Sequence, residues 1–274
     1  MALNQKSIYN LNFKLLDFGG AVKRVFNFIL HHDTYTCIKR NKDLANRSNG
    51  KMAYILALGP SLKMVDLSKI DGDTMVVNRF YRMGSLFPDF VPTYYIMIDY
   101  KFGEEENKND LRAALDMYYD KGTVFLLNPK LKSSGFLANY PEDRIYYLSC
   151  FGGDIHSDKK YRLDGILPAF QNVVGSSIMA LSLMGYKRIT LLGCDFNSFA
   201  SPERIHCYKD ESTVRPDRMS WELFAYSIVA HQYDVLQEYA QRNFFEIINS
   251  TKGSLIDAFP LEIDESVYFN ELDS

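Results

Sequence analysis

Short, uninterrupted apolar runs alternate along the chain with longer segments whose apolar residues recur at helical spacing. Apolar runs without polar alternation are typical of strands that are buried on both faces of a parallel sheet. These runs occupy residues 52–58, 74–77, 93–98, 123–127, 145–148, 188–192 and 245–249. Their alternation with helical segments predicts an α/β fold, here a Rossmann-like, mostly parallel sheet with helices on both faces.

Three segments between the predicted strands have the pattern of helices. Residues 110–121 are amphipathic, and residues 176–186 are small and apolar. Residues 220–243 predict a long amphipathic helix whose apolar face begins with Trp221 and Phe224. Together with the strands, these helices account for most of the chain after residue 50.

The sheet pattern begins at Lys51, so we expect an N-terminal helical extension over residues 1–50 and one nucleotide-binding domain over residues 51–274. Residues 1–50 carry eight Lys or Arg and three Asp, a charge of +5, in a chain whose total is −3. Within them, residues 9–31 predict a basic amphipathic helix. Such a helix lies on an anionic membrane surface, or else packs on the domain or on a second subunit in a homo-oligomer.

Composition and charge exclude several functional classes. The negative net charge argues against a nucleic-acid partner. The four cysteines lack the spacing of a zinc site or a disulfide framework, and we expect no bound metal and no cofactor. The chain has neither a signal-peptide pattern nor a run of 18 apolar residues. It is therefore expected to be cytoplasmic, either free or peripheral on the inner face of the cytoplasmic membrane.

Polar residues and glycines directly follow several predicted strands, namely Gly59-Pro60-Ser61, Asn78, Asp99, Asn128, Gly193-Cys194-Asp195 and Ser250-Thr251. Ligands of an open parallel sheet bind beyond the carboxyl ends of its strands, so these residues are the first candidates for a binding site. We expect Gly59 to let the backbone approach a phosphate, and Ser61 to cap a short helix over residues 62–67. Neither GxGxxG nor GxxxxGK(S/T) is present, so dinucleotide and P-loop sites are not indicated.

Three sequence blocks, taken in their order and spacing, resemble the bacterial sialyltransferases of glycosyltransferase family 42. They also resemble the related pterin pyrophosphokinase-like and motility-accessory-factor proteins. The blocks are ILALGPSLKMVD from residue 55, VVNRFY from residue 76 and SSIMALSLMGYKRITLLGCDF from residue 176. The resemblance covers about residues 52–260, and it implies a single GT-A-like variant of the nucleotide-binding fold and a metal-independent transfer.

The resemblance also implies roles for individual residues. The loop at Gly59 would lie under the nucleotide phosphate, and Asp99 stands where the sialyltransferases have an asparagine. Gly193 and Phe196 open a loop that in the family carries two phosphate-binding tyrosines, where this chain has Phe199 and Tyr208. The implied nucleotide-binding residues are Gly59, Pro60, Ser61, Asn78, Asp99, Asn172, Gly175, Ser176, Gly193, Phe196 and Tyr208.

A transferase of this kind needs a base that takes the proton of the acceptor hydroxyl. His206 lies on the loop after Gly-x-Asp, beside the expected site, and a neutral imidazole suits the role. His231 is the rival, because the family's base lies near the start of the corresponding helix. Asp195 acts as a base or orients ligand hydroxyls, or else it caps its own loop.

The expected function is transfer of a sugar, sialic or another acidic sugar, from a nucleotide-activated donor, most simply CMP-linked. The acceptor would be a bacterial surface polysaccharide or a lipid-linked glycan. Two alternatives stay open. One is pyrophosphokinase-like transfer with ATP and Mg²⁺, and the other is a non-catalytic role in glycan assembly.

Overall fold

The computed structural model describes residues 19, 22, 32–133, 135–151, 153–201, 206–208 and 218–269. The helix predicted over residues 9–31 lies outside this part, apart from two single residues. No helix in the described residues is long and apolar enough to cross a membrane.

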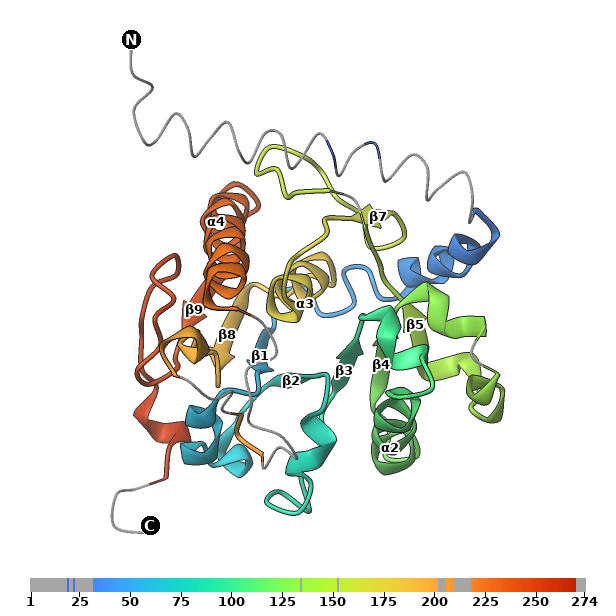
Figure 1. Ribbon diagram of the computed structural model, residues 1–274, viewed down its shortest axis with the longest axis horizontal. Helices are drawn as coiled ribbons and strands as arrows, with labels where there is room; N and C mark the ends of the chain where they lie inside the picture. Colours follow the sequence, from blue (N-terminus) through green and yellow to red (C-terminus); the bar gives the residue numbers. More distant parts are fainter. Residues whose placement is uncertain are drawn as a thin grey trace.

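Seven strands form one sheet in the order β5-β4-β3-β2-β1-β8-β9 (Figure 1). They are β1 (Met52–Leu56), β2 (Asp73–Val77), β3 (Tyr94–Met97), β4 (Val124–Leu127), β5 (Ile145–Tyr147), β8 (Arg188–Leu192) and β9 (Glu246–Asn249). Every neighbouring pair is parallel, so the predicted fold class is confirmed. Each predicted strand is present, with its ends shifted by two residues at most. A separate parallel pair joins β6 (Ser149–Cys150) to β7 (Ile166–Leu167).

The order of the strands reverses beside β1. From β1 the chain builds the sheet outward to β5, and it then returns to place β8 on the opposite side of β1. Beyond the first residues of the loops that follow them, the chain runs from β1 and from β8 to opposite faces of the sheet. In an open α/β sheet this divergence produces a crevice at the carboxyl ends of the two strands.

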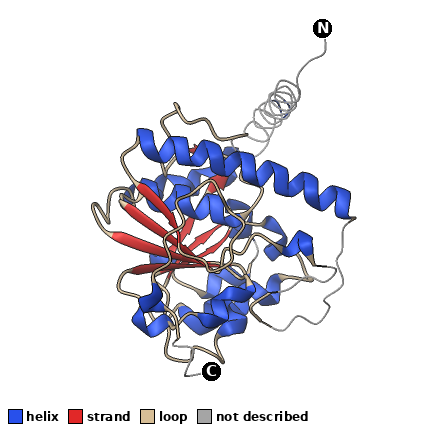
Figure 2. Cartoon of the chain, turned by 90° about the vertical axis from the view of Figure 1, so that its left-hand side faces the viewer, coloured by secondary structure: helices blue, strands red, loops and turns tan. Residues whose placement is uncertain are grey.

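Helices cover both faces of the sheet (Figures 1 and 2). Two longer helices, α3 (Val173–Leu183) and α4 (Met219–Arg242), lie on one face, and α2 (Lys108–Tyr118) lies on the other. Within the described residues, the remaining helical segments are 3-10 helices: η1 (His32–Asp43), η2 (Pro60–Met64), η3 (Leu67–Lys69), η4 (Phe80–Met83), η5 (Tyr100–Gly103), η6 (Pro129–Ser133), η7 (Phe136–Asn139), η8 (Glu142–Arg144), η9 (Ser198–Ala200) and η10 (Glu265–Val267).

The sheet separates two hydrophobic clusters, because successive side chains of a strand point to opposite faces. In β1, Ala53 and Ile55 pack with α3 and α4, whereas Tyr54 and Leu56 pack with α2 and the 3-10 turns. Both faces are apolar for this reason, which is why the strands read as continuous apolar runs in the sequence.

The apolar face predicted for the long helix is wrong at its beginning. Trp221 is 67% exposed and Phe224 is 48% exposed, whereas Tyr233, Leu236 and Tyr239 are buried. The helix makes its core contacts only after its first two turns. Helical spacing alone gives the direction of a face but does not tell where the helix meets the sheet.

The residues directly before β1 pack on the sheet domain. The buried Asn41 side chain donates hydrogen bonds to the carbonyl oxygens of Tyr147 and Leu163, at 2.6 and 3.0 Å. Leu44 is fully buried in the cluster under α3. Residues 32–50 are thus attached to the domain. The helical extension expected over residues 1–50 stays a prediction for the residues before 32.

Candidate functional site

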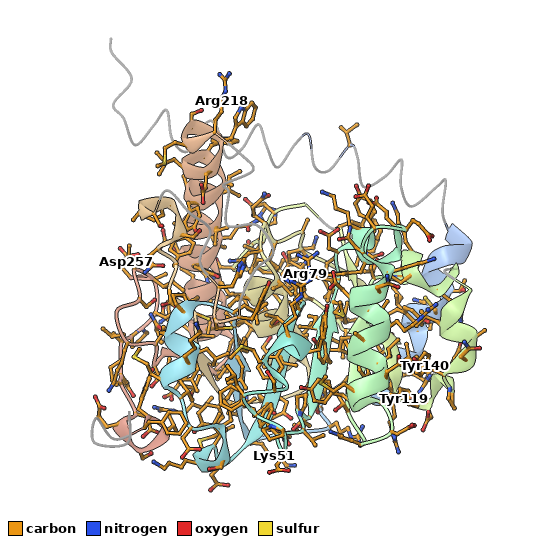
Figure 3. The ribbon with its side chains drawn as sticks, turned by 60° about the horizontal axis from the view of Figure 1, so that its bottom comes forward. Lys51, Arg79, Tyr119, Tyr140, Arg218 and Asp257 are labelled. Carbon is orange, nitrogen blue, oxygen red and sulfur yellow. The ribbon has the colours of Figure 1, made fainter. Side chains whose placement is uncertain are left out.

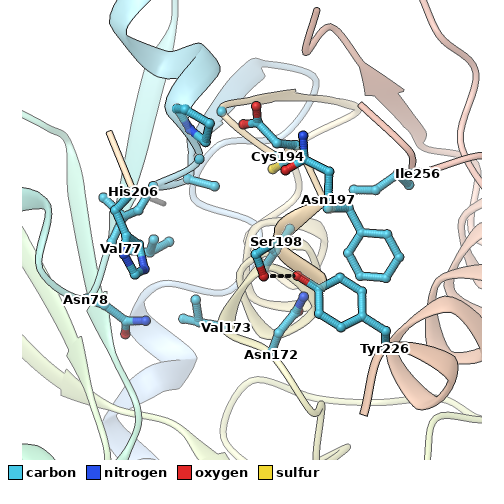
Figure 4. A pocket seen from close by; sticks show the side chains of 18 of the residues that line it. Val77, Asn78, Asn172, Val173, Cys194, Asn197, Ser198, His206, Tyr226 and Ile256 are labelled. Carbon is cyan, nitrogen blue, oxygen red and sulfur yellow. Dashed lines mark hydrogen bonds between the residues drawn. The ribbon is translucent and has the colours of Figure 1, made fainter. Parts of the chain in front are cut away.

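A cavity of about 290 Å³ lies at the carboxyl ends of β1 and β8, where the strand order reverses (Figure 4). We call it the switch-point cavity. Its described lining is Ala57, Leu58, Gly59, Pro60, Val77, Asn78, Asn172, Val173, Val174, Gly193, Cys194, Asp195, Phe196, Asn197, Ser198, His206, Tyr226, Tyr233 and Ile256. The cavity occupies the position at which open α/β sheets bind ligands.

Two loops of the cavity are tied together by a carboxylate. Asp195 Oδ2 accepts a hydrogen bond from the Ser61 hydroxyl at 2.7 Å, and Oδ1 accepts one from the Ser61 backbone N–H at 3.2 Å. The prediction that Ser61 caps a helix is wrong. The 3-10 turn η2 begins at Pro60, two residues before the predicted helix, and its N-cap is Gly59, without a side-chain hydrogen bond.

The same carboxylate explains why residue 59 is glycine. A Cβ atom at Gly59 would overlap the Asp195 carboxylate and would lie 2.6 Å from the Gly193 carbonyl oxygen. The Gly59 N–H donates to that oxygen at 2.9 Å, so the loops remain paired beyond the ends of β1 and β8. The space that a side chain would need is already filled by protein atoms.

Asp195 is enclosed by the loops that it joins, and only 7% of it is exposed. Burial raises the pKa of its carboxyl group, while the two hydrogen bonds from Ser61 act in the opposite direction. Both carboxylate oxygens have a protein donor. The arrangement therefore supplies a link between the two cavity loops, and it leaves the carboxylate at the cavity wall.

Backbone conformation also shapes the β8 side of the cavity. Gly193 has φ +70°, and a Cβ there would lie 2.6 Å from the Ala57 carbonyl oxygen. Phe196 has φ +57°, an unusual conformation for an aromatic residue. Its ring contacts that of Tyr226, with centroids 4.6 Å apart, so packing on α4 holds the strained turn in place.

The third wall is the beginning of α3. Asn172 is the N-cap: its side-chain oxygen accepts from the Gly175 N–H at 3.1 Å, and its amide group donates to the Tyr233 hydroxyl at 2.7 Å. Gly175 is a packing residue, because a Cβ would lie 2.7 Å from Cγ of Phe170. Ser176 is buried in the helix, and it lines neither this cavity nor the larger one that adjoins it.

His206 belongs to the cavity wall, and His231 does not. The imidazole of His206 lies near Asn78 and Val77 in Figure 4. Its ring stacks on that of Tyr208, with centroids 5.0 Å apart and an angle of 11° between the planes. Tyr208 itself is 8% exposed and lies outside the described lining.

Four polar residues of the described lining, Asn197, Ser198, Tyr226 and Tyr233, are absent from the candidates drawn from the sequence. Asn197 and Ser198 follow β8, and Tyr226 projects from α4. The hydroxyl groups of Ser198 and Tyr226 are 2.5 Å apart (Figure 4). The position of Asn197 just after Gly-x-Asp is a sequence signal that would have found it. Nothing in the sequence pairs Ser198 with a tyrosine on the following helix.

A second, larger cavity of about 820 Å³ adjoins the first, and we call it the outer cavity. The two share Asn78, Asn172 and Val173. The outer cavity lies at the carboxyl ends of β3 to β5. Its polar and aromatic lining includes Asp99, Tyr100, Asn128, Lys130, Ser149, Cys150, Phe151, Phe170 and Gln171.

Asp99 belongs to the outer cavity rather than to the switch-point cavity. It is exposed, and its side chain accepts from the Lys101 N–H at 3.0 Å as the cap of η5. The Lys130 ammonium group lies over the Tyr100 ring, 5.2 Å from its centroid. Among the described residues, no group of three His, Cys, Asp or Glu is placed to hold a metal ion.

The sequence matches no protein-family model and no curated protein. Solved structures do match. The sialyltransferase CstII from Campylobacter jejuni, in complex with cytidine-5'-monophosphate, is 14% identical and has a TM-score of 0.50, covering 81% of this chain and 88% of that chain. Its complex with CMP-3FNeuAc is 14% identical with a TM-score of 0.49, and the match covers 80% of this chain and 89% of that chain. The monofunctional α-2,3-sialyltransferase Cst-I from the same organism is 14% identical with a TM-score of 0.45, and the match covers 81% of this chain and 82% of that chain.

At this level of identity the likeness establishes the fold. It agrees with the resemblance that the three sequence blocks predict, so that resemblance is confirmed at the level of structure. This chain therefore has the α/β architecture of the Campylobacter jejuni sialyltransferase CstII.

Proposed function

We propose that this chain is a glycosyltransferase that uses a CMP-linked sugar donor. The observation that carries the proposal is the switch-point cavity, which has His206 in its wall and lies in the fold of a sialyltransferase solved with CMP. A cavity of about 290 Å³ suits a nucleotide portion of a ligand, and the adjoining outer cavity offers room for sugars.

The nucleotide phosphate would bind at the N-terminus of α3. Val173 and Val174 line the cavity there, and the first N–H groups of a helix bind anions. No Lys or Arg is among the described lining residues of the switch-point cavity. We therefore infer that backbone N–H groups, with the amides of Asn78 and Asn172, are the main phosphate donors within the described part of the site.

The sugars would extend into the outer cavity. Amide side chains and aromatic rings there, such as Asn128, Gln171 and Tyr100, are the groups that hydrogen-bond and stack on sugar rings. Lys130 supplies a positive charge for a carboxylate, which fits a sialic or other acidic sugar.

In the reaction, an acceptor hydroxyl oxygen attacks the anomeric carbon of the donor. The new bond joins the acceptor oxygen to that carbon, and the bond between the carbon and the phosphate oxygen breaks. His206 takes the proton of the hydroxyl, and the nucleotide leaves with the electron pair of the broken bond. N–H groups at the α3 N-terminus stabilise the charge on the departing phosphate.

The acceptor would be a surface polysaccharide or a lipid-linked glycan. A lipid-linked acceptor suits a cytoplasmic enzyme that rests peripherally on the inner membrane through the basic residues 9–31. Within the proposal, residues 51–274 form the catalytic domain, and residues 1–50 form its extension.

Ligand-induced thermal stabilisation tests the donor. CMP, CDP, UDP, GDP, ADP and ATP are each added with and without Mg²⁺. A ligand at about 100 times its Kd stabilises the fold by about 2.7 kcal/mol. Selective, Mg²⁺-independent stabilisation by CMP is expected. Stabilisation by ATP only with Mg²⁺ would instead support pyrophosphoryl transfer, and no stabilisation by any nucleotide would contradict the enzyme proposal.

Release of CMP from CMP-sialic acid in the presence of glycan acceptors tests the base. His206→Ala is expected to lower kcat about 100-fold or more, with little change in CMP binding. His231→Ala is the matched control, because it removes an imidazole that lies outside the cavity wall. Equal losses in the two variants would refute the assignment of His206.

A further inference from the structure

The turn after β2 is anchored to α2 by a buried carboxylate. Asp110 accepts a hydrogen bond from Arg79 Nε at 2.8 Å and lies 3.4 Å from Arg82 Nη2. The Tyr81 hydroxyl also donates to Asp110. Three side chains of a single turn thus converge on one carboxylate, which fixes where the Arg82 guanidinium group lies.

Arg82 connects this anchor to the loop that follows β8. Its guanidinium carbon lies 5.4 Å from the centroid of the Tyr208 ring, within the range of a cation–π contact. The Tyr208 ring stacks in turn on the imidazole of His206, at 5.0 Å and 11°. A continuous row of contacts therefore runs from Asp110 through Arg82 and Tyr208 to the wall of the switch-point cavity.

A backbone hydrogen bond holds the residue between the two rings. The Cys207 N–H donates to the Leu58 carbonyl oxygen at 2.9 Å, and Cys207 is fully buried. This bond places the segment 206–208 beside the β1 loop. It leaves the side-chain torsions of His206 to its side-chain contacts, and the stacked Tyr208 ring is a contact that can select the direction of the imidazole.

We propose that Tyr208 is a positioning residue, held by Arg82, which orients the His206 imidazole toward the switch-point cavity. This inference rests on the proposed function, in which His206 is the base. It assigns Tyr208 a different role from the phosphate ligand that the family resemblance implies. The ring makes the contact, and the hydroxyl group is not required.

Nuclear magnetic resonance of the imidazole tests the geometry without any assay of activity. The ring current of a stacked tyrosine shifts the Hε1 resonance of His206, which is assigned by its disappearance in His206→Ala. Tyr208→Leu is expected to return this resonance to the position of an unstacked histidine. Tyr208→Phe keeps the ring and is expected to keep the shift.

Arg82→Met provides a second variant that leaves the buried ring in place. It removes the cation, and it is expected to move the His206 resonance in the same direction as Tyr208→Leu. The control is Arg144→Leu, which removes a comparable contact with Tyr119, at 5.8 Å, and neither residue is in the described lining of the two cavities. Figure 3 shows Tyr119 apart from Arg79, which belongs to the anchored turn. An unchanged resonance in Tyr208→Leu would show that the rings do not stack, and an unchanged resonance in Arg82→Met would show that Arg82 does not hold the ring; either result would overturn the proposal.

Kinetics then test whether orientation matters for transfer. Tyr208→Leu is expected to lower kcat about tenfold with an unchanged KM for the donor, and Tyr208→Phe to restore the rate. In a His206→Ala background, Tyr208→Leu should lower kcat no further, because Tyr208 acts on the reaction only through His206. A loss of CMP affinity in Tyr208→Phe would overturn the proposal in favour of a phosphate-binding hydroxyl.

The two readouts separate the failure of this inference from the failure of the proposed function. If His206→Ala stays fully active, His206 is not the base and the kinetic role of Tyr208 falls with it. The resonance shift in Arg82→Met, which keeps the Tyr208 ring, still decides whether Arg82 acts on the imidazole through that ring.

Discussion

Gly59→Ala should destabilise the fold through one identifiable overlap. Gly59 has φ −69°, which every residue adopts readily, so the substitution costs little in backbone conformation. Its new methyl group would lie 2.6 Å from both the Gly193 carbonyl oxygen and Cγ of Asp195, where an ordinary contact begins at 3.4 Å. The carbonyl oxygen and Cγ must each move by about 0.8 Å, the difference between those distances, and Asp195 Oδ2, which the methyl group would overlap, must move farther.

The cost follows from the hydrogen bonds that such a movement breaks. Asp195 accepts two from Ser61, and a hydrogen bond to a charged group contributes about 1.5–3 kcal/mol. Loss of most of this link lowers the free energy of unfolding by about 3 kcal/mol. For a chain of this size that corresponds to a fall in Tm of roughly 6–12 °C.

Urea unfolding followed by circular dichroism measures the change. Gly253→Ala is the matched control, because Gly253 has φ +73° and nothing within 4 Å of its would-be Cβ. It should cost about 1 kcal/mol, from backbone strain alone. A loss below about 0.5 kcal/mol in Gly59→Ala, or an equal loss in an Asp195→Ala background, would refute the steric argument.

Two further substitutions test the electrostatics and the backbone strain. Because burial raises the pKa of Asp195 above its ordinary 3.8, its contribution to stability is fully present below pH 3.8 and is lost as the pH rises through the raised value. As the pH rises from 3.8 through the raised pKa, the free energy of unfolding of the wild type should therefore fall relative to that of Asp195→Asn. Unfolding measured at several pH values tests this, and a difference between the two proteins that stays constant with pH would contradict the prediction. Phe244 follows the C-terminus of α4, has φ +57° and is 83% exposed. The Phe245 N–H donates to the Ala240 carbonyl oxygen, so the helix ends in a Schellman motif with Phe244 in the left-handed position. Phe244→Gly should raise the free energy of unfolding by about 1 kcal/mol, and a decrease would show that the ring makes a stabilising contact.

The sheet could be predicted because its strands are buried on both faces. Under that condition burial leaves a local signal, an apolar run such as residues 188–192, and the strand appears where the run is. The 3-10 turns leave no comparable signal. Residues 62–67 were expected to form one helix, but Pro60 starts a turn that ends at Met64, and a second turn begins at Leu67.

The candidate site could be predicted only as a set of loops. Position after a strand pointed correctly to Asn78 and Asp195 as residues of the cavity wall, and the family resemblance pointed to Asn172. The contacts between them depend on how distant segments meet, and no local pattern encodes these. Ser61 and Asp195 are 134 residues apart in the chain, so their hydrogen bonds follow from the crossover that places β8 beside β1.

The distribution of charge in the two cavities follows from this topology. Loops that leave β1 and β8 approach each other so closely that Gly59 and Gly193 have no room for side chains, and backbone groups form much of that wall. The loops after β3 and β4 are farther from the reversal of strand order, and they carry charged side chains, Asp99 and Lys130, into the outer cavity. An invariant part of a ligand, such as the nucleotide, is suited to the cavity that this backbone wall encloses. The variable part meets side chains that substitution can alter without disturbing the sheet, so sugar specificity should depend on the outer cavity.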